Sequence, residues 1–247
     1  MVKDHWNSVF QNTLSAGLDI LYPPVCAFCR QVCQPAILFP GICRSCLSKL
    51  PMRTGTSSVL NWQNLAGRQI PNQARVFSTA FYRDPIRQAL LRFKFGDSPE
   101  LAQALAALLI HAIRMKSIVC RAVLAVPLHS SRLRERGYNQ AGLLARQIAN
   151  QLNIPDWSAY LFRNRDTARQ SEQENRNSRL YNLAGAFSLS QEFSQAITEK
   201  DLLEWKSRSI LLVDDVLTTG ATLSEAAYPL WQSGWLVTGI VVASDHR

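Results

Sequence analysis

The segment Ile210–Leu223 constrains the fold most, because it places charged side chains directly after a fully apolar stretch. The four apolar residues Ile210–Val213 are typical of a strand buried in a parallel sheet. Asp214 and Asp215 follow at once, and open α/β sheets bind ligands outside the carboxyl ends of their strands. Because adjacent carboxylates repel each other, we expect ribose hydroxyls or Mg2+ to lie between them.

A hydroxyl-rich loop follows the acidic pair. It consists of Thr218, Thr219, Gly220, Ala221 and Thr222, and a helix is predicted from Ala221 to Trp231. A helix N-terminus presents free N–H groups, which bind phosphate, and threonine hydroxyls add further donors. The alternative is an ordinary strand–turn–helix unit with threonine caps, which explains the threonines but not the carboxylates upstream. We therefore interpret the loop as a phosphate site.

Strand and helix patterns alternate along most of the chain. Strands are expected at 76–82, 122–126, 185–189, 210–213 and 235–243. Helices are expected from Ile86 to a stop at Gly96, from the Ser98–Glu100 start to about Met115, over 139–152 and over 221–231. This alternation predicts an α/β fold, with a mostly parallel sheet and helices on both of its faces.

Four of the six cysteines form two spaced pairs, Cys26 with Cys29 and Cys43 with Cys46. Two such pairs present four thiolates to one tetrahedral ion, and the proline and glycine residues at 23–24 and 40–41 are expected to form turns ahead of each pair. Disulfides are the alternative, which a reducing compartment disfavours. We predict a structural Zn2+ ribbon, in which Cys33 is a spare thiol or an alternative ligand.

The chain is expected to divide into an N-terminal helix and ribbon (1–53), a polar linker (54–74) and an α/β domain (75–247). The N-terminus lacks the basic start, apolar block and cleavage site of a signal peptide, which favours a cytoplasmic protein. Leu101–Ile113 is the longest apolar candidate, and Gln103 and His111 interrupt it. A membrane span needs about 20 apolar residues, so no span is expected.

Basic residues are concentrated before residue 182, and the last quarter of the chain is acidic, within a net charge of +9. Arg132, Arg134 and Arg136 lie close together ahead of Tyr138. They are candidates for binding pyrophosphate or nucleic-acid phosphates, with Tyr138 as a stacking platform, and ordinary surface solvation is the alternative. We interpret Lys94 as a solvated helix end, and the alternative is a place in the specificity hood or on a DNA-facing surface. The polar stretch 163–182, with Arg165, Arg169, Arg176 and Arg179, is either a loop that covers ligand or a solvated loop.

Residues 210–223 resemble the phosphoribosyl pyrophosphate (PRPP) signature of type I phosphoribosyltransferases. Further segments resemble the competence-associated ComF family, namely RFKFGD (92–97), VPLHSSRLRERGYNQA (126–141), RDTARQ (165–170) and AGAF (184–187). That family places a cysteine ribbon ahead of a phosphoribosyltransferase domain. The resemblance covers nearly the whole chain, and it implies a type I phosphoribosyltransferase-like fold.

The resemblance also implies roles for individual residues. Asp214 and Asp215 are expected at the ribose 2′- and 3′-hydroxyls as the catalytic pair, and residues 218–222 at the 5′-phosphate. The loop after Leu128, with Arg132 and Arg136, is expected at the pyrophosphate. Loss of pyrophosphate from C1′ places positive charge on the sugar and negative charge on the leaving group, which calls for Mg2+ and basic groups.

Two functions follow from these expectations. The favoured one is a PRPP-binding protein that serves DNA uptake in natural transformation, with single-stranded DNA and DNA-uptake proteins as further partners. The alternative is an active, Mg2+-dependent phosphoribosyltransferase of nucleotide metabolism, similar to amidophosphoribosyltransferases. The acidic pair and hydroxyl loop support PRPP binding in either case, whereas the role in DNA uptake comes from the family resemblance alone.

Overall fold

A computed structural model of the chain describes residues 23–60, 62, 71, 74–165, 185–195 and 208–246. The helix expected before the ribbon lies outside these residues, as does most of the expected linker. Arg169, Arg176 and Arg179 of the expected covering loop also lie outside them, whereas Arg165 is described and is exposed.

Within the described residues, five strands form one sheet in the order β3–β4–β9–β8–β5. They are β3 (Val59–Leu60), β4 (Arg75–Phe81), β9 (Leu236–Ser244), β8 (Ser209–Leu217) and β5 (Ala122–Ala125). The short edge strand β3 is antiparallel to β4, and the other neighbouring pairs are parallel. This mostly parallel sheet confirms the predicted fold class.

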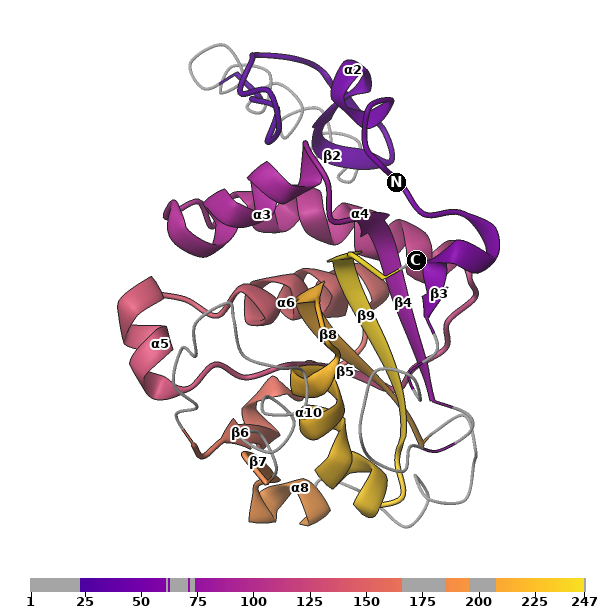
Figure 1. Ribbon diagram of the computed structural model, residues 1–247, viewed down its shortest axis with the longest axis vertical. Helices are drawn as coiled ribbons and strands as arrows, with labels where there is room; N and C mark the ends of the chain where they lie inside the picture. Colours follow the sequence, from indigo (N-terminus) through magenta and orange to yellow (C-terminus); the bar gives the residue numbers. More distant parts are fainter. Residues whose placement is uncertain are drawn as a thin grey trace, which may run out of the picture.

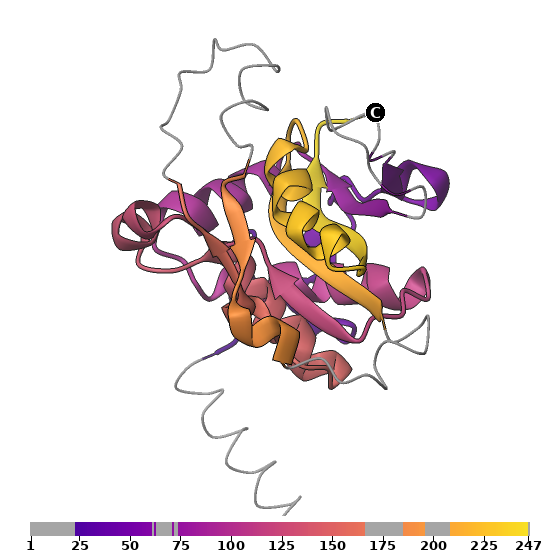
Figure 2. The same ribbon diagram turned by 90° about the horizontal axis from the view of Figure 1, so that it is seen from below.

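Helices cover both faces of the sheet (Figure 1, Figure 2). On one face lie α4 (Leu101–Met115) and α6 (Gln140–Leu152), with α3 (Ile86–Phe95) packed against α4. On the other face lies α10 (Ala221–Gln232). In the interior strand β8, Leu211 and Val213 pack toward α4 and α6, while Ile210 and Leu212 pack toward α10. Both faces are buried, which explains the unbroken apolar run in the sequence.

Several short elements lie outside this sheet. β6 (Leu161–Arg163) and β7 (Phe187–Leu189) pair antiparallel with each other, so the strand predicted over 185–189 forms but does not join the parallel sheet. The basic run at 130–136, which we expected as a loop, is the helix α5 (Ser130–Arg136). The remaining elements are the 3-10 turns η1 (Gly55–Ser58) and η3 (Ser158–Tyr160) and the helix α8 (Gln191–Gln195).

The cysteine ribbon contains β1 (Pro35–Ala36), β2 (Phe39–Cys43) and α2 (Arg44–Leu47). β1 and β2 form an antiparallel hairpin whose turn is Ile37–Leu38. The turn predicted at Pro40–Gly41 is wrong, because both residues lie inside β2.

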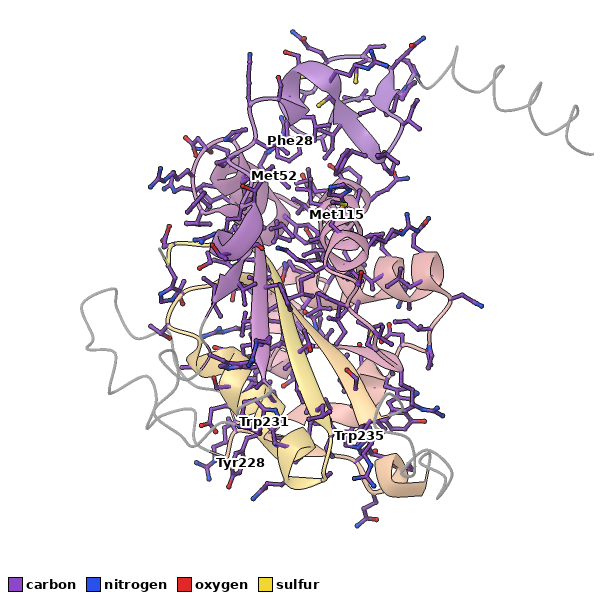
Figure 3. The ribbon with its side chains drawn as sticks, turned by 90° about the vertical axis from the view of Figure 1, so that its right-hand side faces the viewer. Phe28, Met52, Met115, Tyr228, Trp231 and Trp235 are labelled. Atoms are coloured by element: carbon purple, nitrogen blue, oxygen red, sulfur yellow. The ribbon has the colours of Figure 1, made fainter. Side chains whose placement is uncertain are left out.

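The ribbon packs directly on α4 (Figure 1). Ile42 is fully buried and belongs to the same apolar core as α4 and α6. Gly41 has a φ of +77°, and a side chain on it would lie 3.3 Å from the Cβ atom of Ala104, so glycine permits the close approach. Figure 3 shows Phe28, Met52 and Met115 near this junction, far from Trp231 and Trp235. The division of the chain at 54–74 stays a prediction.

Arg53, directly after the ribbon, is hydrogen-bonded to the C-terminal residues Ser244 and His246. Its side chain is 6% exposed and donates hydrogen bonds to the backbone oxygens of Ala80, Ser244 and His246. The guanidinium also stacks on the ring of Phe81, 4.0 Å from the ring centroid. One buried cation therefore joins the ribbon exit, β4 and the end of β9.

No helix in the described part of the chain has both the length and the apolar content to cross a bilayer.

We expect Arg53→Met to lower the free energy of unfolding by about 2–3 kcal/mol, because buried carbonyl groups lose their donor. The matched control is Arg83→Met, since Arg83 stacks on the same ring from 5.4 Å but is exposed. The control should change stability by less than about 0.5 kcal/mol. Urea unfolding measures both, and equal losses would contradict the role of Arg53.

Candidate functional site

A crevice opens where β8 runs past the end of β5. The last register pair is Ala125 with Val213, after which the chain leaves β5 toward α5 while β8 continues to Leu217. Beyond α5, helix α6 covers one face of the sheet, whereas α10 after β8 covers the other, so the segments that follow the two strands diverge here. Such a switch point is the usual ligand site of open α/β sheets.

A pocket of about 200 Å³ lies in this crevice. It is lined by residues from α3, the 126–141 segment, β6, β8 and the loop that leads to α10: Lys94, Val126, Pro127, Leu128, Arg132, Arg136, Asn139, Gln140, Ala141, Arg163, Asp214, Asp215, Val216, Thr218 and Thr222. The arrowheads of β8 and β9 point toward the end of the molecule where α3 lies (Figure 1).

Asp214 and Asp215 are part of β8, so their side chains leave the strand in opposite directions. Asp215 is 6% exposed, and its backbone N–H donates to Oδ1 of Asp214 at 2.8 Å. Burial and the negative charge of Asp215 together raise the pKa of Asp214 from its ordinary value of 3.8 to about 7. Asp214 thus takes up a proton near neutral pH, unlike exposed carboxylates.

Lys94 pairs with the acidic site, which the sequence did not indicate. Its Nζ atom lies 3.0 Å from Oδ1 of Asp215, and 23% of the Lys94 side chain is exposed. The interpretation of Lys94 as a solvated helix end is therefore wrong. The cation lies in the last turn of α3, at the rim of the pocket.

The 136–141 segment holds the end of α3 in place. The Tyr138 hydroxyl donates to the backbone oxygen of Phe93 at 2.8 Å and accepts from the Ser98 N–H at 3.2 Å. The Gln140 side chain, 2% exposed, donates to the same Phe93 oxygen. The Tyr138 ring packs toward Phe93, and its stacking role toward nucleic acid stays a prediction. The segment fixes the helix turn that carries Lys94.

Four arginines lie around the crevice, and three of them line the pocket. Arg132 and Arg136 of α5 line the pocket, as does Arg163 at the end of β6, which sequence reasoning missed. Arg136 also donates to Gln140 at 3.1 Å and stacks over Phe95. Arg134 is exposed on the same helix and does not line the pocket. Because the run is helical, Arg132 and Arg136, four residues apart, share the pocket face, and Arg134 lies on the outer face.

The hydroxyl loop completes the pocket on the α10 side. Thr218 and Thr222 line it, and Gly220 precedes the helix with a φ of +78°. The Thr219 hydroxyl accepts from the Ala221 N–H at 3.4 Å. The His246 ring contacts the carbonyl of Thr218, so the end of the chain lies against this loop. Helix α10 thus begins at the pocket, with its first N–H groups unpaired within the helix.

The four predicted cysteines converge in the ribbon. The sulfur atoms of Cys26, Cys29, Cys43 and Cys46 all lie within 4.8 Å of one another. Metal–sulfur bonds of about 2.3 Å in a tetrahedron separate the sulfurs by about 3.8 Å, and the Cys29–Cys43 pair is separated by 4.0 Å. This four-sulfur cluster fits a metal ion. Cys33 is described nearby but is not part of the cluster.

The fold and the site together define a class of protein. A mostly parallel sheet flanked by helices carries an acidic pair and a hydroxyl loop at its switch point, behind a cysteine ribbon. These features describe a phosphoribosyltransferase-like α/β protein with an N-terminal four-cysteine ribbon.

Comparison with relatives of known name narrows the class of protein to one family. It is 33% identical over 172 residues to "Competence protein F" of Haemophilus influenzae, covering 68% of this chain and 71% of the relative. It is 32% identical over 169 residues to "DNA utilization protein YhgH" of Escherichia coli K12, covering 66% and 69%. The chain belongs to the ComF family. "Competence protein ComFC" of Bacillus subtilis is 26% identical over 211 residues, covering 78% and 79%.

No family model matches the chain. Among solved structures, adenine phosphoribosyltransferase from Leishmania tarentolae is similar with a TM-score of 0.34 and 14% identity, covering 72% of this chain and 94% of that chain. At this score the similarity says nothing about the ligand.

The raised pKa of Asp214 predicts a pH-dependent stability. Between pH 4 and pH 7 the folded state binds more protons than the unfolded state, so the contribution of Asp214 to stability falls as pH rises through this window. We compare the free energies of unfolding of the wild type and of Asp214→Asn. The wild-type value minus the variant value is expected to decrease from pH 5 to pH 8. Urea unfolding at both pH values measures it, with exposed Glu135→Gln as control. A difference that grows with pH would contradict the assignment.

Proposed function

We propose that the protein binds PRPP in the crevice at the end of β8. The observation that supports this is a single pocket that holds two carboxylates, two threonines of the loop and four cationic side chains. Carboxylates accept hydrogen bonds from sugar hydroxyls, while a helix N-terminus and basic side chains bind phosphate. A sugar that carries phosphate groups at both ends matches all three kinds of group.

The residues divide between the parts of this ligand. Asp214 and Asp215 bind the ribose 2′- and 3′-hydroxyls, and Thr218, Thr219, Gly220, Ala221 and Thr222 hold the 5′-phosphate. Arg132 and Arg136 face the pyrophosphate, and Arg163 adds a further positive charge beside the acidic pair.

The role of the protein is in DNA uptake. The names "Competence protein F" and "DNA utilization protein" of the relatives support this proposal. Single-stranded DNA and DNA-uptake proteins are the partners, and the location is the cytoplasm, where reduced thiols are kept available for metal. A nucleic-acid contact falls on the outer side of α5, where Arg134 is exposed.

Catalytic turnover as a phosphoribosyltransferase is the second candidate. The position of Arg132 and Arg136 in the pocket favours it, since these cations can stabilise pyrophosphate as it leaves C1′. Mg2+ is expected beside the acidic pair in such a reaction. Asp215 is already paired with the Lys94 ammonium, so the carboxylates present do not fit a divalent ion as an open pair.

A structural Zn2+ in the ribbon belongs to the same proposal. The sulfur spacing fits a tetrahedral ion, and such a closed site supports folding because all four positions are filled by protein ligands. Burial alone would raise the pKa of Cys26, but backbone N–H groups of Cys43, Cys29 and Phe28 lower it to about 6. A thiolate at neutral pH is the form that binds zinc.

Binding of PRPP tests the main proposal. We expect calorimetry to detect binding to the wild type and at least a tenfold loss for Asp214→Asn or Thr222→Val, because each removes a ligand contact. Arg132→Ala should weaken binding as well, through the pyrophosphate.

Arg134→Ala is the matched control for Arg132→Ala, on the same helix but outside the pocket. It should leave the PRPP affinity unchanged while it weakens single-stranded DNA binding and its salt dependence. Unchanged PRPP affinity in all the pocket variants would disprove the site, and release of pyrophosphate with a nucleobase or amine acceptor would establish turnover.

Metal analysis tests the ribbon. We expect about one zinc per chain in reduced protein, and clearly less in Cys43→Ser, because a four-thiolate site loses one ligand. Cys33→Ser is the matched control within the ribbon and should retain the metal, since Cys33 is not in the four-sulfur cluster. Loss of zinc in Cys33→Ser, or none in the wild type, would contradict the assigned ligands.

A further inference from the structure

We propose that Lys94 supplies the positive charge at the ribose carboxylates, so that the pocket binds a pentose phosphate without a divalent metal ion. This inference rests on the proposed function, because it concerns the same pocket. In this proposal the Lys94 ammonium offsets the negative charge of Asp214 and Asp215, which Mg2+ was expected to do.

The geometry of the ion pair carries the proposal. The Lys94 ammonium lies 3.0 Å from Oδ1 of Asp215, and the Asp215 side chain is only 9% exposed. A metal ion at this oxygen would have to displace the ammonium or lie beside a like charge. Burial alone would lower the pKa of Lys94, but the charges of Asp215 and Asp214 raise it above its ordinary value, so the amine stays protonated.

Lys94 is also held in place by its own helix turn. The backbone oxygen of Phe93, the preceding residue, accepts hydrogen bonds from Tyr138 and from buried Gln140. Phe93 itself is fully buried in the core that α4 and α6 share. The ammonium is therefore presented to Asp215 by a backbone that is fixed at the preceding residue, which makes it a preorganised partner.

The charge of the whole pocket agrees with this role. Lys94, Arg132, Arg136 and Arg163 face two carboxylates, so basic groups outnumber acidic ones two to one. A ligand with phosphate groups at two positions is strongly anionic. The pocket offers it positive charge from protein side chains alone, and the carboxylates, offset by Lys94, remain hydrogen-bond acceptors for hydroxyls.

The deciding experiment compares binding to the wild type in EDTA and in millimolar Mg2+. The probes are PRPP and ribose 5-phosphate, because the latter lacks the pyrophosphate that would bring its own metal. We expect both ligands to bind in EDTA, with ribose 5-phosphate affinities in the two buffers within about threefold. Binding of PRPP that requires Mg2+ would overturn this inference and leave the proposed function intact. No binding in either buffer would overturn both.

Substitution of Lys94 tests the proposal a second time. We expect Lys94→Met to bind ribose 5-phosphate at least tenfold more weakly in EDTA and to recover with Mg2+, because the metal then replaces the lost charge. Lys94→Gln keeps a donor for Asp215 and serves if the methionine variant does not fold. Exposed Lys49→Met is the matched control and should behave as wild type. Wild-type affinity of the Lys94 variants in EDTA would disprove the proposal.

Discussion

Strand β8 is buried on both faces, and this constraint organises the molecule. Its side chains alternate between the helices on one face and α10 on the other, so the four residues from Ile210 to Val213 are apolar. Where β5 ends, the strand loses one neighbour, and polar residues become possible. The same alternation then sends Asp215 toward the α3 side and Asp214 toward the α10 side. The side chains of β8 thus keep alternating between the two faces beyond the apolar core, and there they form the site.

Local sequence patterns predicted those parts of the fold that depend on residues close together in the chain. The apolar run before Asp214, the cysteine spacing and the helix from Ala221 are all local, and the structure places them as expected. β6 was missed because three residues are too few to show a period. Its partner β7 was recognised as a strand, but the sequence does not reveal which sheet a strand joins.

Contacts between distant segments limited what could be predicted of the site. Lys94 ends a helix whose sequence has no mark of a binding residue, and only the packed fold brings it to Asp215. Tyr138 follows a basic run, which favoured a nucleic-acid role, yet its partners Phe93 and Ser98 are decided by packing. The RGYNQA segment therefore holds the RFKFGD segment in place: Tyr138 and Gln140 bind the helix turn that carries Lys94. Neither sequence pattern indicates this contact by itself.

The mixture of charges in the pocket distinguishes between the two anionic partners considered for this protein. Carboxylates repel phosphate, so their presence among four cations is useful only if the ligand also brings hydroxyl donors. Ribose 5-phosphates carry free 2′- and 3′-hydroxyls. A DNA strand lacks the 2′-hydroxyl and has its internal 3′-oxygens esterified, so its sugars have no hydroxyl to donate to the acidic pair. The pocket therefore favours the proposed free sugar phosphate, and a DNA strand would be better accommodated at Arg134 on the outer side of α5, away from the acidic pair.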